Sequence, residues 1–339
     1  KFKADWDALV AAAKKEGKVN VFFSGAGPGF TKIGLDFEAA YPGIKAEITA
    51  ISTASLFLPK IAQEREAGLY NWDVVQVQAP FALTKGTLRE LGTLEPLRPL
   101  LIHPEVLNDK AWPGGFEKSW VDTDKKWAFA FSWQLIGLLW INTDMVKEGE
   151  IKTIKDLADP KWKGKITSAD PRNHGQGFIP ATIIAGRYGN DLLNKIWVDQ
   201  EAVLSRDTRQ ITESLVRGKY AAAFGVTPAD LQPFLDQGLG KNVKGLAIDS
   251  AAPLVRGIEY ASKAPNPNAA KLFLNWFLSK DGATSWANNT LLNSRRIDAP
   301  VVDKLTWVDP NLNHPLVMDT EELMNKPLET AEYFKKIIP

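Results

Sequence analysis

The chain has no cysteine, which excludes disulfide bonds, thiolate metal sites and a cysteine nucleophile. It also lacks an excess of charge of either sign, because 41 Lys and Arg residues against 40 Asp and Glu residues give a formal net charge of +1. This balance, without a dense Lys/Arg run, predicts that nucleic acid is not a partner. No apolar run approaches the roughly 20 residues needed to span a bilayer. The chain begins at Lys1 rather than Met, so we expect that a signal peptide has been removed.

Several enzyme motifs are missing as well. Neither a Walker loop, nor G-x-S-x-G, nor H-E-x-x-H occurs. The segment GAGPGF at 25–30 departs from the dinucleotide pattern because its last residue is Phe30. The three histidines, His103, His174 and His314, lie far apart and share no metal-ligand spacing. We therefore predict no catalytic residues, no metal site and no cofactor.

What remains is typical of a soluble globular protein. Hydrophobic residues make up 45% of the sequence and charged residues 24%, which is ordinary for this class. A length of 339 residues suggests two domains and allows a large core. The twelve tryptophans are abundant, and we expect most of them to pack in the core.

Strands and helices alternate in the first 80 residues. Short apolar runs predict strands at 19–25, 44–52 and 72–78, and helices are expected before, between and after them. This alternation is typical of a parallel sheet with helices on its faces. Ligands of such sheets bind beyond the carboxyl ends of the strands.

A second α/β unit is expected after residue 160. Its predicted strands are 164–170 and 219–226, with helices at 191–203 and 211–218. Further strands are expected at 127–142 and 253–262, and a helix–turn–helix at 266–288. We predict two lobes, with chain crossings near 130–137 and 253–261. The predicted lobes are 1–131 with 259–300, and 132–258 with 301–339.

Polar residues follow the expected strand at 164–170, in the segment SADPRNHGQGF at 168–178. A plain turn does not need this many hydrogen-bonding groups. One interpretation is a helix N-terminus that binds a ligand through backbone N–H groups, with Arg172 as an additional donor. The alternative is a solvated loop that caps the helix.

Three other positions also leave two interpretations open. In SRDTRQ at 205–210, Asp207 or Thr208 is expected to cap a helix, whereas Arg209 is a candidate for ligand contact. Trp133 is either a core aromatic residue or part of a ligand-binding wall. Arg295 and Arg296 read as a surface pair, with Arg296 as an alternative anion partner.

Four stretches together resemble a known family: DALVAAAKKEGKVNVFFSG, LADPKWKGKITSADP, ESLVRGKYAAAFG and APNPNAAKLFLNWFLSKDG. They are similar to the extracellular solute-binding proteins of family 1, and within it to the ferric-iron-binding-like branch. The resemblance spans residues 7 to 282. It implies an α/β fold of the type II periplasmic binding proteins, with two lobes and a hinged cleft. It also implies a monomeric periplasmic protein that delivers a small-molecule solute to the membrane permease of an ABC importer.

The sequence departs from the iron branch at one position. That branch has two consecutive tyrosines where this chain has Thr227 and Pro228, and none of its six tyrosines are adjacent. Without two phenolate ligands, ferric iron is disfavoured as the solute.

The leading prediction is a carrier of a small organic anion bearing a carboxylate, phosphate or phosphonate. Arg172 would be its charge partner, backbone N–H groups would bind its oxygens and Trp133 would pack on its apolar part. The alternatives are a carrier of a cation such as thiamine or a polyamine, a carrier of ferric iron, and an enzyme on the same fold. The predicted ligand-binding residues are Ser24, Gly25, Ala26, Gly27, Ser52, Thr53, Gln78, Trp133, Asp170, Arg172, Asn173, Gln176, Gly177, Arg209, Thr227 and Arg296.

Overall fold

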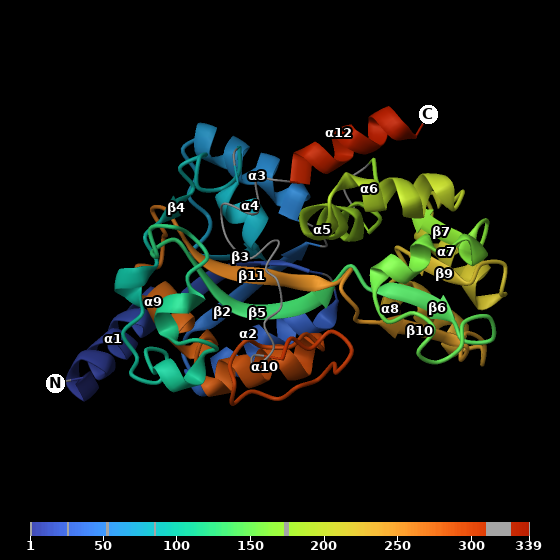
Figure 1. Ribbon diagram of the computed structural model, residues 1–339. Coiled ribbons are helices and arrows are strands. Elements are labelled where there is room, and N and C mark those ends of the chain that lie inside the picture. The colour runs from blue at the N-terminus through green and yellow to red at the C-terminus, as the bar shows by residue number, and fades with distance from the viewer. Residues whose placement is uncertain are drawn as a thin grey trace. The chain divides into compact units, whose positions relative to one another are not determined.

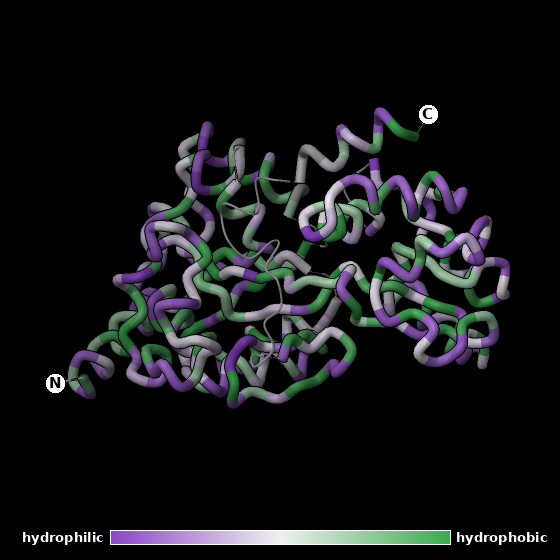
Figure 2. The backbone as a smooth tube through the Cα atoms, viewed as in Figure 1, coloured by the Kyte–Doolittle hydropathy of each residue, from purple (hydrophilic) through white to green (hydrophobic). Residues whose placement is uncertain are grey.

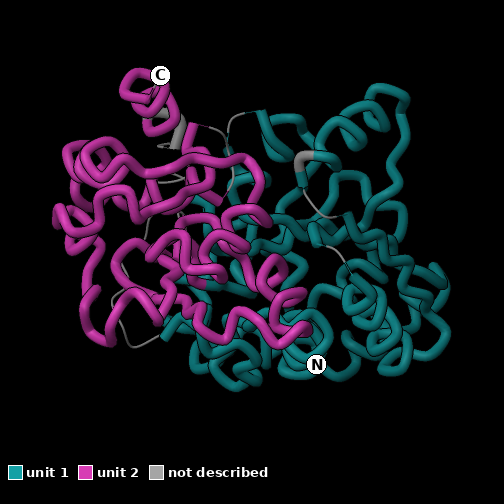
Figure 3. Tube along the Cα trace, turned by 90° about the vertical axis from the view of Figure 1, so that its right-hand side faces the viewer, with its two compact units in different colours: residues 1–134, 254–313, 318–324 teal, residues 135–253, 314–317, 325–339 magenta. Residues whose placement is uncertain are grey.

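A computed structural model of the chain describes residues 2–25, 27–51, 54–84, 86–172, 176–309 and 327–338. The chain divides into two compact units (Figure 3). Unit 1 comprises residues 1–134, 254–313 and 318–324, and unit 2 comprises 135–253, 314–317 and 325–339. The lobes predicted from the sequence are 1–131 with 259–300, and 132–258 with 301–339. These bounds stay a prediction.

Unit 1 is built on a six-stranded mixed sheet (Figure 1). Its strands are β1 (Lys18–Ser24), β2 (Lys45–Ile51), β3 (Val74–Gln78), β4 (Leu94–Glu95), β5 (Ala128–Ile136) and β11 (Ala252–Ala261). The main order is β2-β1-β3-β11-β4, and β5 pairs with β11. β1 is parallel to β2 and β3, whereas β11 is antiparallel to β3 and β4. The parallel pairing predicted from the first 80 residues is therefore confirmed, and β11 makes the sheet mixed.

Helices cover both faces of this sheet, as the alternation of buried residues along β1 requires. Phe22 points to one face and stacks on Phe57 with ring centroids 3.7 Å apart. Phe23 points to the other face and packs near Phe277 and Trp286. Consecutive residues of a strand point to opposite faces, so β1 contributes to two separate cores. Figure 1 shows α3 and α4 on one side and α2 and α10 on the other.

The helices of unit 1 lie before, between and after the strands, as the sequence predicts, and two more lie within 266–288 or close to it. They are α1 (Phe2–Glu16), α2 (Pro28–Ala40), α3 (Ala54–Glu66), α4 (Ala79–Leu83), α9 (Pro267–Phe277) and α10 (Lys280–Thr290). Short 3-10 turns lie at Arg98–Leu100, Asp109–Ala111 and Phe116–Ser119. Pro28 and Pro267 each occupy a first helical turn, where the missing N–H is tolerated.

Unit 2 has a five-stranded sheet with the order β10-β6-β9-β7-β8. The strands are β6 (Leu139–Asn142), β7 (Ile166–Ala169), β8 (Val203–Ser205), β9 (Ala222–Phe224) and β10 (Val243–Leu246). β7 is parallel to β8 and β9, and β6 is antiparallel to β9 and β10. The helices are α5 (Phe178–Tyr188), α6 (Asn190–Leu193), α7 (Thr208–Val216), α8 (Pro228–Leu235) and α12 (Pro327–Ile337). Further turns of 3-10 helix lie at Ile154–Ala158 and Pro160–Trp162, and a π-helix at Asn194–Asp199.

The unit 2 core lies where this sheet meets its helices. Trp197 stacks on Phe224 with ring centroids 4.9 Å apart, and Phe334 of α12 packs on Trp197. Figure 2 shows hydrophobic residues along the strands of both sheets and hydrophilic residues along many of the connecting segments. Some details differ from the sequence prediction, and two of them lie in unit 2. The helix expected at 191–203 ends at Asp199, because β8 begins at Val203, and β10 was not predicted.

Candidate functional site

In unit 1, polar groups gather where β1 and β3 end. Ser24 is the last residue of β1 and Gln78 the last of β3, and the Ser24 hydroxyl donates to Gln78 Oε1 at 3.1 Å. β11 runs in the opposite direction and brings Arg256 directly across from Gln78 in the strand register. The Arg256 Nη1 donates to the Ser24 carbonyl oxygen at 3.1 Å. The structure thus brings together two predicted residues and one that the sequence analysis missed.

Arg256 is unusual because its charge is buried without an ion-pair partner in the described part of the chain. Its residue exposure is 9%, and burial lowers the pKa of the guanidinium to about 10, so the group stays charged at neutral pH. The Nε atom is buried and makes no hydrogen bond. A signal existed in the sequence: an arginine inside the apolar strand PLVRGIEYAS has to be either paired or functional.

Gln76 is a second buried polar residue that the sequence analysis missed. It is fully buried, and among the described residues neither its amide oxygen nor its amide nitrogen has a hydrogen-bond partner. On β3 it lies two residues before Gln78 and across from Ile258. The period of two in a strand therefore places it on the same face as Gln78 and Arg256. We refer to Ser24, Gln76, Gln78 and Arg256 as the Arg256 cluster.

The glycines after β1 have identifiable conformational roles. The Gly25 N–H donates to the Ile51 carbonyl at 2.8 Å, and a Cβ atom at Gly25 would lie 2.0 Å from the Phe30 ring. Gly27 adopts a φ of 109° immediately before Pro28, in a region that favours glycine. These contacts fix the turn that leads into α2. Four other predicted residues lie outside the described part of the chain: Ala26, Ser52, Thr53 and Asn173.

In unit 2, the end of β7 carries an aspartate with two arginine neighbours. Asp170 is buried and accepts hydrogen bonds from Arg172 Nε at 2.9 Å and Nη2 at 3.0 Å. Arg206 Nε lies 3.5 Å from Asp170 Oδ2, the oxygen that also accepts from Arg172 Nη2. Burial alone would raise the pKa of Asp170, but hydrogen bonds and charge from Arg172 and Arg206 hold it below the ordinary value. Arg172, predicted as the charge partner of an anion, therefore already contacts a carboxylate of the protein.

Gly177 lies where the polar loop becomes α5. It is the N-cap residue of this helix, and a Cβ atom there would lie 1.9 Å from the Ala169 carbonyl oxygen. Only glycine lets the start of α5 approach the end of β7 so closely. Gln176 beside it is exposed. The helix expected after SADPRNHGQGF is thus confirmed, and a ligand role for Gln176 and Gly177 stays a prediction.

Thr227 and Arg209 lie at two further helix starts in unit 2. Thr227 is the N-cap of α8: its hydroxyl accepts from the Asp230 N–H at 3.2 Å and donates to the Asp230 carboxylate at 2.7 Å. Asp207 caps α7, as one interpretation of SRDTRQ predicted, by accepting from the N–H groups of Arg209 and Gln210. The Arg209 side chain is exposed.

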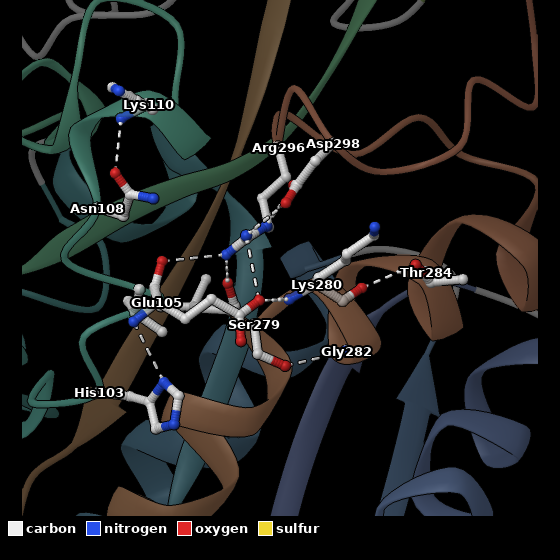
Figure 4. A network of polar contacts seen from close by, with 12 residues as sticks. His103, Glu105, Asn108, Lys110, Ser279, Lys280, Gly282, Thr284, Arg296 and Asp298 are labelled. Carbon is white, nitrogen blue, oxygen red and sulfur yellow. Dashed lines mark hydrogen bonds and ion pairs between the residues drawn. The ribbon is translucent and has the colours of Figure 1, made fainter.

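Arg295 and Arg296 correct a sequence prediction, because both are buried rather than a surface pair. The Arg295 guanidinium lies 4.9 Å from the ring centre of the half-buried Trp133. Arg296 pairs with Asp298 at 2.8 Å and with Glu105 at 3.2 Å, and donates to the Leu278 carbonyl (Figure 4). These partners hold the Arg296 guanidinium inside unit 1, so its contacts give it a structural role and do not support its prediction as an anion partner.

Two surface hollows lie away from these strand ends. One, of about 330 Å³, is lined in unit 2 by residues such as Ile141, Lys147 and Lys244. The other, of about 480 Å³, is lined in unit 1 by residues such as Lys110 and Trp112. Neither contains a predicted ligand-binding residue. We place the candidate site at the strand ends because the buried Arg256 guanidinium, which makes no ion pair in the described part of the chain, lies there beside Ser24 and Gln78.

The described ranges show neither clustered metal ligands nor a helix that could cross a membrane. No three His, Cys, Asp or Glu side chains there are grouped so that they could hold a metal ion. In the same ranges, no helix has both the length and the apolar character needed to cross a membrane.

Solved structures define the class of fold. A Trichodesmium protein (IdiA, FutA), in complex with iron and citrate, superposes with a TM-score of 0.70 at 17% identity, covering 95% of this chain and 99% of that one. Ferric iron-binding protein A of Mannheimia haemolytica, in an open conformation, gives 0.70 at 15% identity, covering 95% and 98%. The substrate-binding protein of an Agrobacterium tumefaciens ABC transporter gives 0.65 at 16% identity, covering 95% and 94%. The chain therefore has the α/β type II fold of periplasmic binding proteins.

The family follows from the sequence itself. Residues 23–284, well over half of the chain, match the model of the bacterial extracellular solute-binding proteins. The chain belongs to this family, as the resemblance predicted. An uncharacterized protein of Haemophilus influenzae is 27% identical over 158 residues, which are 42% of this chain and 42% of that relative. That alignment thus spans less than half of the relative's length.

Proposed function

We propose that the protein is the solute-binding component of an ABC importer and that its solute is a small organic anion. Membership of the extracellular solute-binding family supports a carrier, and one structural neighbour is the substrate-binding protein of an ABC transporter. On this proposal the protein works outside the cytoplasmic membrane, its partners are the solute and a membrane permease, and the solute is returned unchanged. It is not an enzyme.

One observation supports an anion over a cation. At the strand ends of unit 1, positive charge is in excess, because the buried Arg256 guanidinium makes no ion pair in the described part of the chain. A site for thiamine or a polyamine would need the opposite excess, with carboxylates facing the ligand. The strand-end residues of unit 1 are the groups that we propose to bind the solute.

Ferric iron is the competing solute, because several structural neighbours are iron-binding proteins. Thr227 and Pro228 stand where the iron branch has its tyrosines, and the Thr227 hydroxyl already caps α8. A neutral hydroxyl is a weak ligand for ferric ion, and proline offers no side-chain donor. These residues support an organic solute.

The decisive experiment is mass spectrometry of the small molecules released when the purified protein is denatured. An organic anion, recovered unchanged after incubation with the native protein, is the expected result. Recovery of a polyamine, of thiamine or of iron, or a chemical change in the molecule during incubation, would contradict the proposal. Calorimetry with the recovered compound then gives the affinity.

A further inference from the structure

Two arginines of this chain, Arg172 and Arg296, use one side of the guanidinium in the same way. Arg172 donates through Nε and Nη2 to the two carboxylate oxygens of Asp170, at 2.9 and 3.0 Å. Arg296 donates through Nε and Nη2 to Asp298, at 2.8 and 2.9 Å. This side presents two parallel N–H groups that match the spacing of carboxylate oxygens. In both places the protein supplies its own carboxylate.

In the described part of the chain, no carboxylate faces the Nε and Nη2 donors of Arg256. Its one hydrogen bond in the described part of the chain runs from Nη1, on the other side of the group, to the Ser24 carbonyl oxygen. Its Nε is buried without a partner, and the residue is 9% exposed. A neutral carbonyl oxygen does not neutralise a buried positive charge, and such a charge without an anion is strongly unfavourable.

The neighbouring side chains are neutral and incompletely bonded. Gln76, on the same face of the sheet, has an amide N–H₂ donor and an amide oxygen that find no partner within the described ranges. Gln78 and Ser24 bond to each other through side-chain oxygens. The Arg256 cluster therefore holds one positive charge, and Gln76 can both donate to and accept from a bound molecule. One charge in such surroundings matches a ligand group that carries a single negative charge.

Resting on the proposed function, we infer that the Arg256 cluster binds a monoanionic carboxylate group of the solute. The two carboxylate oxygens take the Nε and Nη2 donors of Arg256, as Asp170 and Asp298 do elsewhere in the chain. The Gln76 amide donates to the same carboxylate or to a polar group next to it. This assigns the anion to Arg256 rather than to Arg172.

Acetate is a suitable probe because it carries this group and little else. After exhaustive dialysis, the full chain is titrated with sodium acetate at constant ionic strength, and Tm is followed. Acetate should raise the Tm of the wild type by mass action. Arg256→Gln should weaken the apparent acetate affinity more than about tenfold. Arg256→Lys should also weaken it, because an ammonium group lacks the two parallel donors.

The matched control is Arg65→Gln in the same unit. The Arg65 guanidinium donates to the backbone carbonyls of Thr93 and Ser262 and contacts no residue of the Arg256 cluster in the described ranges. This variant should keep the wild-type response to acetate.

Arg256→Met adds a measurement that distinguishes a ligand-binding role of Arg256 from a structural one. If the buried charge destabilises the ligand-free protein, this variant should have a higher Tm than the wild type when both are measured without acetate. Its Tm should not change when acetate is added.

A direct measurement covers the case in which the Arg256 variants do not fold. In ¹⁵N-labelled wild-type protein, the Arg256 Nε–Hε resonance should shift as acetate is added and should saturate with the Tm effect. An unshifted resonance, an unchanged wild-type Tm or an undiminished response in Arg256→Gln would overturn the inference. So would stabilisation by methylphosphonate or tetramethylammonium instead of acetate. The proposed function has its own test: it is contradicted if the denatured protein releases no organic anion.

Discussion

Glu259 offers a sharp test of how the unit 1 sheet tolerates a buried acid. Its side chain is fully buried on β11, and within the described ranges it makes no ion pair. Burial raises the pKa of Glu259 well above its ordinary value of 4.5; the nearby Val77 N–H opposes this shift, and the charge of Asp122 adds to it. Folding thus favours the protonated, neutral form of this side chain.

The pH dependence of stability follows from this shift. Below pH 4.5 the carboxyl is protonated in both the folded and the unfolded chain, so its contribution to stability is fully present. As the pH rises from there to the folded pKa, the unfolded chain loses the proton and the folded chain keeps it. The unfolding free energy then falls by up to about 1.4 kcal/mol for each pH unit.

Glu259→Gln has nearly the same shape and does not titrate, so it should remove this slope. Urea unfolding of the wild type and the variant is measured at a series of pH values. The difference in unfolding free energy should grow in favour of the variant as the pH rises above 4.5. Glu66→Gln, on the exposed end of α3, controls for the loss of a surface carboxylate. If the difference between wild type and Glu259→Gln is independent of pH, the reasoning is refuted.

Four further outcomes are expected. Arg296→Met should lower the unfolding free energy by about 1–3 kcal/mol in urea titrations, because buried carbonyl acceptors such as that of Leu278 lose their donor; wild-type stability would contradict its structural role. Gly177→Ala should lower Tm, because its Cβ would lie 1.9 Å from the Ala169 oxygen, and an unchanged Tm would show that α5 shifts freely. Ferric citrate should neither raise Tm nor produce a visible absorption band, since Thr227 replaces a phenolate; a band with stabilisation would restore iron as the solute. Small-angle scattering should give a smaller radius of gyration with the identified solute, and an unchanged radius would count against the hinged closure that the family resemblance implies.

The elements of the fold could be predicted from the sequence because their signals are local. The apolar run at 19–25 is β1, and the Thr227-Pro228 pair begins α8 with a side-chain cap and a proline in the first turn. The direction of β11 could not be predicted in this way. Its pairing with β3 joins segments about 180 residues apart, and an apolar run gives no information about the direction of its neighbour.

The candidate site could be predicted only in part. The strand ends were found because the polar residues of a strand end follow an apolar run directly, as at Ser24 and Gln78. The burial of Arg296 was missed because its partner Glu105 is remote in sequence, so the tandem arginines looked like a surface pair. Arg256 was missed for the same reason, because its neighbours Gln78 of β3 and Ser24 of β1 are remote from it in sequence.

The sequence around Arg172, Arg296 and Arg256 nevertheless distinguishes an arginine that is paired within the protein from one that can bind a solute. Arg172 follows Asp170 by two residues and Arg296 precedes Asp298 by two, so each guanidinium has a carboxylate on the same short segment. At the same spacing from Arg256 the chain has Leu254 and Ile258, which cannot neutralise a charge. A guanidinium with a local aspartate is satisfied when the chain folds. One flanked by apolar residues inside a strand stays unsatisfied until an anion arrives, and the end of a strand in this fold is where a solute can supply it.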